Sequence, residues 1–330
     1  MSEEVFVGKR GTYKLSQQHP IAYGRTSVLY AGIDESGNDV CIKLFRDPPD
    51  PKDSSRSFAH EVQAQRGMSH PNILPVVDYG AAQELTPGPF LVMPLCTGGD
   101  LRSMIQSRDF VPLHEALTVL QQVAAAIDYA HRSGFIHGDI KPENILFRHS
   151  GSQPCLADFG VSRYFPFTER VVTMEGQERA GSTAYLSPEQ VERNEISPRS
   201  DIYAFALVAY ELLAGALPFD MKAPAFQLMK AKVEGKLADP RDLNPMIPAP
   251  TSKVLLKCLH TDPKSRPSSA SEFCDALAIS GQPASRGGGR RSSVWGSLPL
   301  AHRITLVAAI ITAVGAIVAA GIIMIPSLLK

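Results

Sequence analysis

The residues best suited to chemistry lie in one short stretch, HGDIKPENIL, at residues 137–146. It holds Asp139, Lys141 and Asn144, which offer a carboxylate, an ammonium and an amide oxygen. A carboxylate orients an acceptor hydroxyl, a cation offsets charge on a phosphoryl group in transfer, and an amide oxygen binds Mg²⁺. Asp and Asn also form turns in loops that have no catalytic role. The stretch therefore indicates phosphoryl transfer only if the other parts of such a site follow in the chain.

Those other parts occur in the expected order. Lys43 ends the run VCIK on a predicted strand, Glu61 follows in a predicted helical segment, and Asp158 begins the sequence DFG. Lys43 is predicted to contact the α- and β-phosphates of a nucleotide, with Glu61 holding that lysine. Asp158 is predicted to bind the metal together with Asn144. Each residue alone is commonplace, but their joint order favours a nucleotide site.

The pattern of apolar residues changes once along the chain. Residues 13–94 are rich in short strand-like runs and contain one helical segment, residues 57–68. Beyond Gly99, apolar residues recur at helical spacing, most clearly over residues 113–130. The chain therefore predicts an α+β fold with a small β-rich part followed by a larger helical part. The predicted strands are residues 27–33, 40–45, 74–79 and 90–93.

A long apolar run near the C-terminus predicts a single transmembrane helix. Residues 304–325 carry no charge, and at about 1.5 Å per residue they extend roughly 33 Å, enough for a hydrocarbon core of ~30 Å. The alternative is a buried core helix, but such helices seldom lack a polar face over this length. Residues 280–303 form a basic Gly/Ser-rich linker, and residues 326–330 form a short non-cytoplasmic tail. The excess of positive charge before the run places the preceding part in the cytoplasm.

Composition indicates which classes of binding partner to expect. The 33 basic and 33 acidic residues balance, so we expect no nucleic acid partner. Five cysteines occur without a CxxC pair, which is typical of reduced thiols, and the N-terminus lacks the apolar region of a signal peptide. Membrane lipid is an expected partner of the apolar run. Its small residues, including Gly315 and Ala319 at a spacing of four, are compatible with close packing of two helices and hence with a homodimer, although small residues are common in such helices in any case.

Residues 13–279 resemble a eukaryotic-type (Hanks-type) Ser/Thr protein kinase domain, and the whole layout resembles the membrane-anchored members found in bacterial cell membranes. The resemblance rests on the motifs above and on several others in the family's order. The others are HPNI at 70–73, the hinge LVMPLC at 91–96 followed by GGDL at 98–101, GSTAYLSPE at 181–189, DIYAFA at 201–206 and DPKSRP at 262–267.

The resemblance implies a bilobal protein with a tail at residues 1–12, an N-lobe at residues 13–95 and a C-lobe at residues 96–279. It implies transfer of the γ-phosphate of ATP to Ser/Thr hydroxyls of protein substrates and of the kinase itself, with Mg²⁺ or alternatively Mn²⁺. Asp139 and Lys141 are the implied catalytic residues. The implied nucleotide-binding residues are Ala22, Gly24, Ser27, Leu29, Cys41, Lys43, Glu61, Met93 as gatekeeper, Leu95, Asn144 and Asp158, of which Asn144 and Asp158 bind the metal.

Three positions depart from the family's pattern. Gly24 is the only one of three phosphate-loop glycines, because Ala22 and Ser27 occupy the other two positions. Gly138 stands where most members have an arginine that pairs with a phosphorylated activation loop, so activation is expected not to depend on that switch. Ala206 replaces a glycine, with an effect limited to local packing.

Three other interpretations fit parts of the sequence. A pseudokinase scaffold that binds nucleotide or a partner without turnover is favoured by the altered glycine loop. Small-molecule phosphotransferases also often carry HGD, but they lack the SPE and DPxxRP motifs, whose Glu189 and Arg266 should form a buried ion pair according to the resemblance. A purely structural membrane protein would need none of the metal-site residues.

Overall fold

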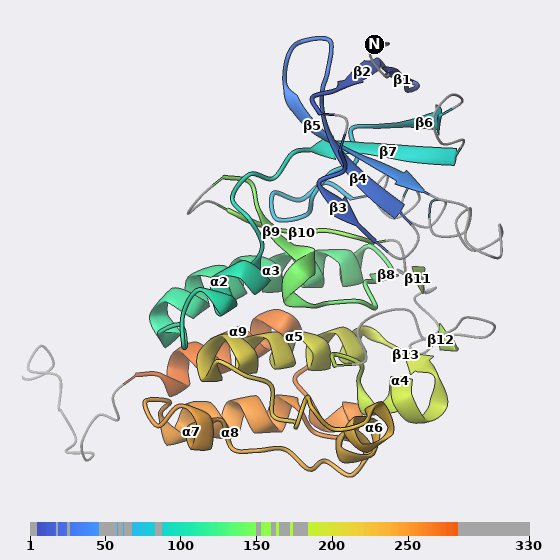
Figure 1. Cartoon of the computed structure of the whole chain (residues 1–330). Coiled ribbons are helices and arrows are strands. Elements are labelled where there is room, and N and C mark those ends of the chain that lie inside the picture. Colours follow the sequence, from blue (N-terminus) through green and yellow to red (C-terminus); the bar gives the residue numbers. More distant parts are fainter. Residues whose placement is uncertain are drawn as a thin grey trace, which may run out of the picture. The chain divides into compact units, whose positions relative to one another are not determined.

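The computed structural model divides the chain into Met1–Gln282 and Pro283–Lys330, and the second unit lies wholly outside the residues that the structure describes. Figure 1 shows the first unit as a strand-rich N-lobe above a helical C-lobe. The bilobal α+β prediction is therefore confirmed. The described residues are 5–17, 19–24, 27–45, 58, 62, 68–82, 88–149, 153–159, 163–164, 172–173 and 184–282.

One antiparallel sheet forms the N-lobe. Its strands follow the order β1-β2-β4-β5-β7-β6, with β3 paired to β4 at the side. The predicted strands at residues 27–33 and 40–45 correspond to β4 and β5, which pair along their whole length. The strands are β1 Val5–Val7, β2 Thr12–Leu15, β3 Ala22–Tyr23, β4 Ser27–Ile33, β5 Asp39–Phe45, β6 Asp78–Ala82 and β7 Gly88–Pro94.

The sheet begins at Val5, earlier than the boundary expected at Tyr13. Phe6 is 2% exposed and packs edge-to-face on Phe90, with ring centroids 5.2 Å apart. The chain then bridges from Gly8 to Gly80 of β6, so the two ends of the strand order meet. Part of the segment expected to be an N-terminal tail is therefore integral to the N-lobe core, because an aromatic side chain of that segment is buried there.

The strand predicted at residues 74–79 is displaced. The strand β6 begins only at Asp78, and the preceding residues run as a connector without regular pairing. Leu74 is 2% exposed, packs in the same cluster as Met93 and donates its N–H to the carbonyl of Leu156 at 2.9 Å. Its apolar character thus reflects burial between the lobes rather than a place in the sheet.

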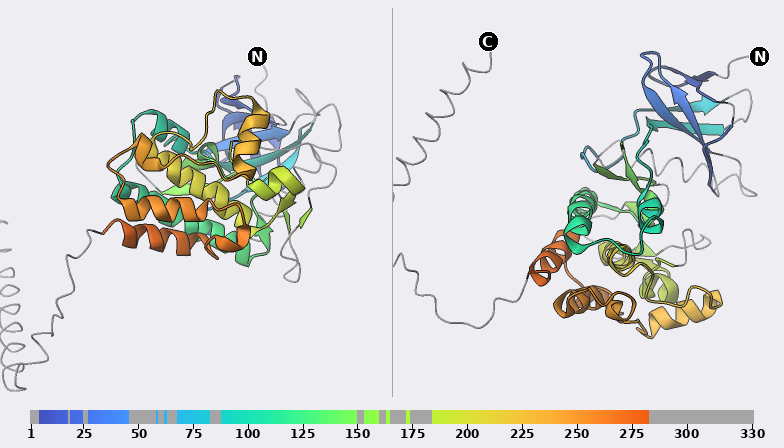
Figure 2. Two further views of the ribbon diagram at one scale, coloured as in Figure 1. Left: turned by 90° about the horizontal axis from the view of Figure 1, so that it is seen from below. Right: turned by 60° about the vertical axis from the view of Figure 1, so that its left-hand side comes forward.

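In the part of the chain that the structure describes, the C-lobe is helical with three short pairs of two-residue or three-residue strands (Figure 2). The helix predicted over residues 113–130 is α3. The elements of the C-lobe are α2 Leu101–Gln106, α3 Leu113–Arg132, β8 Phe135–Ile136, η1 Pro142–Asn144, β9 Ile145–Phe147, β10 Pro154–Leu156, β11 Arg163–Tyr164, β12 Val172–Thr173, α4 Pro188–Arg193, β13 Glu195–Ile196, α5 Pro198–Ala214, α6 Ala225–Val233, α7 Pro240–Leu243, α8 Ala249–Cys258, η2 Pro263–Ser265 and α9 Ala270–Ser280.

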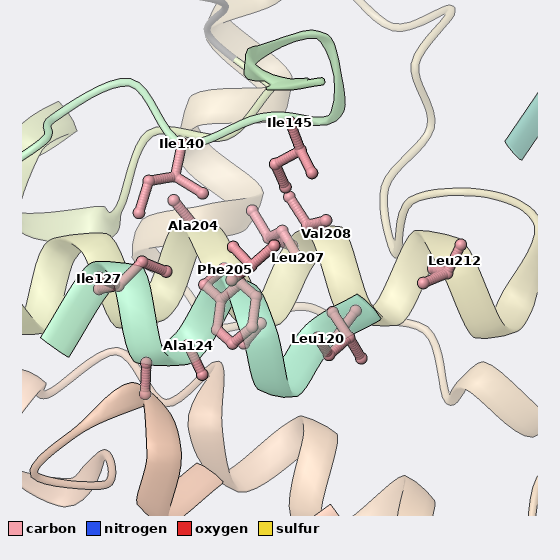
Figure 3. Packing of buried hydrophobic residues seen from close by; sticks show 14 of the residues in the cluster. Leu120, Ala124, Ile127, Ile140, Ile145, Ala204, Phe205, Leu207, Val208 and Leu212 are labelled. Atoms are coloured by element: carbon pink, nitrogen blue, oxygen red, sulfur yellow. The ribbon is translucent and has the colours of Figure 1, made fainter. Parts of the chain in front are cut away.

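Helix α5 is the centre of the C-lobe. Every residue from Ser200 to Ala214 is buried, as expected for a helix that is apolar on all sides. Its Phe205 lies among Leu120 and Ala124 of α3 (Figure 3). Ala206, at the position where the family has glycine, is fully buried in this packing. Because the side chains of α5 are closely packed on every side, this helix is a rigid base for the catalytic loop that packs on it.

A buried ion pair joins helix α4 to the end of η2, as the motif resemblance predicted. The Arg266 guanidinium lies 2.7 Å from both carboxylate oxygens of Glu189, and the two side chains are 0% and 3% exposed. Arg266 also donates to the carbonyls of Arg199, His260 and Thr261. All five guanidinium N–H groups therefore have partners, which is the condition for burying such a charge.

Within the described part of the chain, no helix combines the length and apolar character that crossing a bilayer requires. The run at residues 304–325, the tail at residues 326–330 and all but the first three residues of the linker at residues 280–303 lie outside that part. The membrane helix stays a prediction.

Candidate active site

A cleft of about 720 Å³ lies between the sheet and the C-lobe. The side of the cleft formed by the sheet depends on the strand register. Lys43 of β5 pairs with Leu29 of β4, and Cys41 of β5 pairs with Met93 of β7. Residues two apart on a strand share a face, so Cys41 and Lys43 point to the same side. The predicted nucleotide-binding residues that line the cleft are Ala22, Gly24, Ser27, Leu29, Cys41, Lys43, Met93, Leu95, Asn144 and Asp158, joined by the predicted catalytic Lys141.

Two predicted site residues are not among the cleft-lining side chains. Asp139 borders a small neighbouring cavity, which it shares with Gly138, Tyr185 and Leu186. Glu61 lies outside the described residues, so its contact with Lys43 stays a prediction.

The loop that carries Asp139 is held from below by α5. The carboxylate of Asp201 accepts the backbone N–H groups of His137 and Gly138, both at 2.8 Å, and a ring nitrogen of His131 lies 2.8 Å away. Gly138 has φ of 81°, a left-handed conformation in which a side chain would be strained. The glycine found in place of the family's arginine therefore occupies this backbone without strain.

Asp139 is the centre of a short network within that loop. Lys141 donates its Nζ to Oδ2 of Asp139 at 2.6 Å. The amide nitrogen of Asn144 donates to the Asp139 carbonyl at 2.7 Å and to the same Oδ2 at 3.1 Å. Burial raises the pKa of Asp139, and the Lys141 charge opposes this only in part. Because both side chains contact Oδ2, Oδ1 is the atom best placed to accept a proton from a substrate hydroxyl.

Asp158 is placed against Lys43 by an unusual backbone conformation. Its φ is 65°, which is rare for a residue other than glycine and is found disproportionately at functional sites. Lys43 Nζ lies 2.9 Å from Asp158 Oδ1. Burial alone would raise the pKa of Asp158, but the Lys43 charge and hydrogen bond lower it to about 2. The carboxylate is therefore ionised at neutral pH.

Asn144 and Asp158 fit a divalent cation. Because the Asn144 amide nitrogen is used by Asp139, its oxygen points to the opposite side of the amide group. Both residues line the same cleft, where they offer an amide oxygen and an ionised carboxylate. Such hard oxygen donors suit Mg²⁺ or Mn²⁺. The donor set thus agrees with the metal role predicted for these two residues.

A network that the sequence did not indicate connects this cleft with the segment before α4. Arg102 of α2 donates to Glu143, which lines the cleft, at 2.9 Å and to Glu211 of α5 at 2.6 Å. It also donates to the Tyr185 hydroxyl at 2.5 Å, and that hydroxyl donates to Glu211 at 2.5 Å. The members are far apart in sequence, so no spacing pattern could have identified them.

A strand lysine, an ionised aspartate and an amide line one cleft, with a second aspartate in the adjoining loop, and these are the side chains that phosphoryl transfer from a nucleotide requires. The chain belongs to the protein kinase family, because the description "Protein kinase domain" matches it over residues 15–277.

Several curated relatives are similar over most of this chain. It is 31% identical over 273 residues to "Serine/threonine-protein kinase PrkC" of Bacillus subtilis, covering 82% of this chain and 41% of that protein. It is 32% identical over 286 residues to "Serine/threonine-protein kinase PknA" of Mycobacterium tuberculosis, covering 84% and 63%. It is 33% identical over 258 residues to "DNA damage-responsive serine/threonine-protein kinase RqkA" of Deinococcus radiodurans, covering 78% and 38%. The chain thus spans less than two thirds of the length of each of these relatives.

Proposed function

We propose that this protein is a Ser/Thr protein kinase that transfers the γ-phosphate of ATP to serine and threonine hydroxyls of proteins. The carrying observation is that Asp139 and Lys141, 2.6 Å apart, lie in one loop with Asn144 at the cleft that also holds the Lys43–Asp158 ion pair. The Ser/Thr specificity is supported by the names of the relatives, all of which are called serine/threonine-protein kinases.

In the proposed reaction, Oδ1 of Asp139 accepts the proton of the acceptor hydroxyl as its oxygen forms a bond to the γ-phosphorus. The bond between that phosphorus and the β,γ-bridging oxygen breaks, and ADP leaves. The Lys141 ammonium, which lines the cleft, offsets the charge of the γ-phosphate. Lys43 binds the α- and β-phosphates from the sheet side. A divalent cation held by Asn144 and Asp158 would neutralise charge on the phosphate oxygens.

The decisive experiment follows labelled phosphate from ATP and Mg²⁺ to the protein itself and to a generic basic protein. The variant Asp139→Asn should lose transfer by about 10²- to 10⁴-fold and still bind nucleotide, because Asp139 borders a cavity beside the cleft. The matched control is Asp242→Asn, which alters an exposed carboxylate of α7. It should leave transfer unchanged.

A pseudokinase scaffold is the second candidate, favoured by the retention of only Gly24 among the three phosphate-loop glycines. It predicts nucleotide binding by the wild type without any transfer of label. Equal transfer by the wild type and Asp139→Asn would instead contradict the assigned role of Asp139.

We also propose that residues 304–325 anchor the kinase domain to the cytoplasmic face of a bacterial membrane and that the kinase phosphorylates itself. The support for the anchor is the uncharged run and the basic residues that precede it. The full chain should remain with membranes after alkaline extraction, whereas a chain that ends before Ile304 should be released. Release of both chains would remove the case for the anchor, for lipid as a partner and for dimerisation through the helix.

A further inference from the structure

A lysine of the C-lobe is buried, and no carboxylate of the described residues pairs with it. Lys232 of α6 has no exposed surface, although lysine is among the residues least often buried. Its Nζ donates to the backbone carbonyls of Ala184 at 2.8 Å and Leu186 at 2.9 Å. Nζ also lies 4.5 Å from the ring centroid of Phe219 and 5.5 Å from that of Tyr203. The side chain is thus committed to one short segment, residues 184–186.

Among the described residues, the ammonium of Lys232 has few contacts that offset the cost of removing it from water. Arg266 lies 4.8 Å from the centroid of the same Tyr203 ring and is paired with Glu189. Burial lowers the pKa of Lys232 to about 7. The two carbonyl bonds and the two ring faces therefore carry most of the compensation for removing this amine from water.

The segment that Lys232 holds lies beside the catalytic aspartate. Tyr185 and Leu186 border the same small cavity as Asp139. The Tyr185 hydroxyl is held from the other side by Glu211. The segment is therefore fixed at its side chain by α5 and at two carbonyls by α6, while none of its three residues is among those lining the nucleotide cleft.

We infer that Lys232 is a positioning residue for the protein acceptor: it fixes residues 184–186 next to Asp139 and so shapes the surface on which the acceptor chain docks. The inference rests on the proposed kinase function. Without Lys232 the carbonyls of Ala184 and Leu186 would be buried without donors, so the segment would have to rearrange to satisfy them. Binding of the acceptor then weakens. The ATP cleft is affected less, because the segment does not line it and reaches it only through Arg102 and Glu143.

The test measures steady-state kinetics of the full chain with ATP and a generic basic protein as acceptor, varying each substrate in turn. Lys232→Met keeps the length of the side chain and removes its N–H donors. The acceptor KM should rise about tenfold or more, since two charge-assisted bonds are lost, while the KM for ATP stays within about twofold. Lys232→Arg keeps charged donors and should restore most of the acceptor affinity.

Lys230→Met is the matched control, because Lys230 lies on the same helix with a side chain that is 68% exposed. It should leave both KM values unchanged. Hydrolysis of ATP without acceptor is followed in parallel and should be equal in all four proteins. A lowered kcat with unchanged acceptor KM in Lys232→Met would show a merely structural role and overturn the inference.

The inference and the proposed function fail in different ways. If the wild type transfers no phosphate, the kinase assignment fails before Lys232 is tested. If the Lys232 variants do not fold, the acceptor KM of the wild type is measured between about pH 6 and pH 9. A rise of that KM as the ammonium loses its proton, with a constant KM for ATP, supports the inference, and a flat profile contradicts it.

Discussion

Removing Arg266 should leave the buried carboxylate of Glu189 without its cationic partner. The resulting loss of folding stability can be estimated from the contacts of Arg266. The substitution Arg266→Met keeps much of the side-chain volume but deletes two bonds to Glu189 and three to backbone carbonyls. Glu189 is 3% exposed and would keep its bond from Ser200, at 2.8 Å, as a remaining partner. Breaking one side of a buried pair costs about 3–5 kcal/mol, and total stabilities are only about 5–15 kcal/mol.

The assay is urea unfolding of the full chain followed by the helical signal of circular dichroism, which the C-lobe dominates. Arg266→Met should lower the free energy of unfolding by about 3–5 kcal/mol at neutral pH. Adding Glu189→Gln should recover part of the loss, because the stranded charge is removed. The difference between the double variant and the sum of the singles measures the coupling.

The pH dependence of the stability deficit distinguishes an unpaired buried charge from a simple loss of packing. In the wild type, burial would raise the pKa of Glu189, but the bonds from Arg266 hold it below its ordinary value. In Arg266→Met, burial is opposed only by the hydrogen bonds from Ser200 and from the backbone, so the folded pKa is expected to rise above the unfolded value of about 4.3. The folded variant then binds the extra proton, and its deficit should shrink as the pH falls from 7 toward 5. A deficit below about 1 kcal/mol, or one that is independent of pH, would refute this reasoning.

Three further predictions follow from other contacts. Gly138→Ala should destabilise the fold by about 1–2 kcal/mol in thermal unfolding, because it forces a side chain into a left-handed backbone that Asp201 holds in place. Since burial raises the pKa of Asp139, kcat should fall on acidification at a pH above the ordinary aspartate range, and a limb at or below that range would contradict the raised pKa. Asp128→Ala should cost about 1–3 kcal/mol in urea unfolding, because the buried carboxylate accepts the N–H of Ala270 at 2.8 Å at the start of α9; an unchanged midpoint would show that water replaces it.

The catalytic loop was predictable from sequence because its contacts are local. Asp139, Lys141 and Asn144 lie within six positions of one another, so residue types and spacing already imply that their side chains meet. The pairing of Glu189 with Arg266 is different, since 77 residues separate them and only the family resemblance suggested it. Physical reasoning from composition alone would not have found that ion pair.

The role of Lys232 could not be predicted, because the sequence does not distinguish it from Lys230. The two lysines are of the same type on one short helix, yet one is fully buried and the other largely exposed. Their difference is set by carbonyls 46 and 48 residues away. Similarly, three apolar or aromatic residues at Val5–Val7 are too few to show a strand period, and their partners lie much later in the chain.

The N-terminal strand has a consequence for how this kinase behaves at high concentration. The backbone N–H groups of Lys9 and Arg10 and the hydroxyl of Tyr13 all converge on Asp78, which ties the hairpin down at the start of β6. In a fragment that starts at Tyr13, the outermost strand β6 would lose this cover and the fully buried Phe90 would lose its aromatic neighbour. An exposed edge strand with apolar side chains can pair with strands of other molecules and so promote aggregation. Residues 5–12 therefore protect this edge of the N-lobe sheet from self-association, and fragments made for crystallisation or drug screening should retain them.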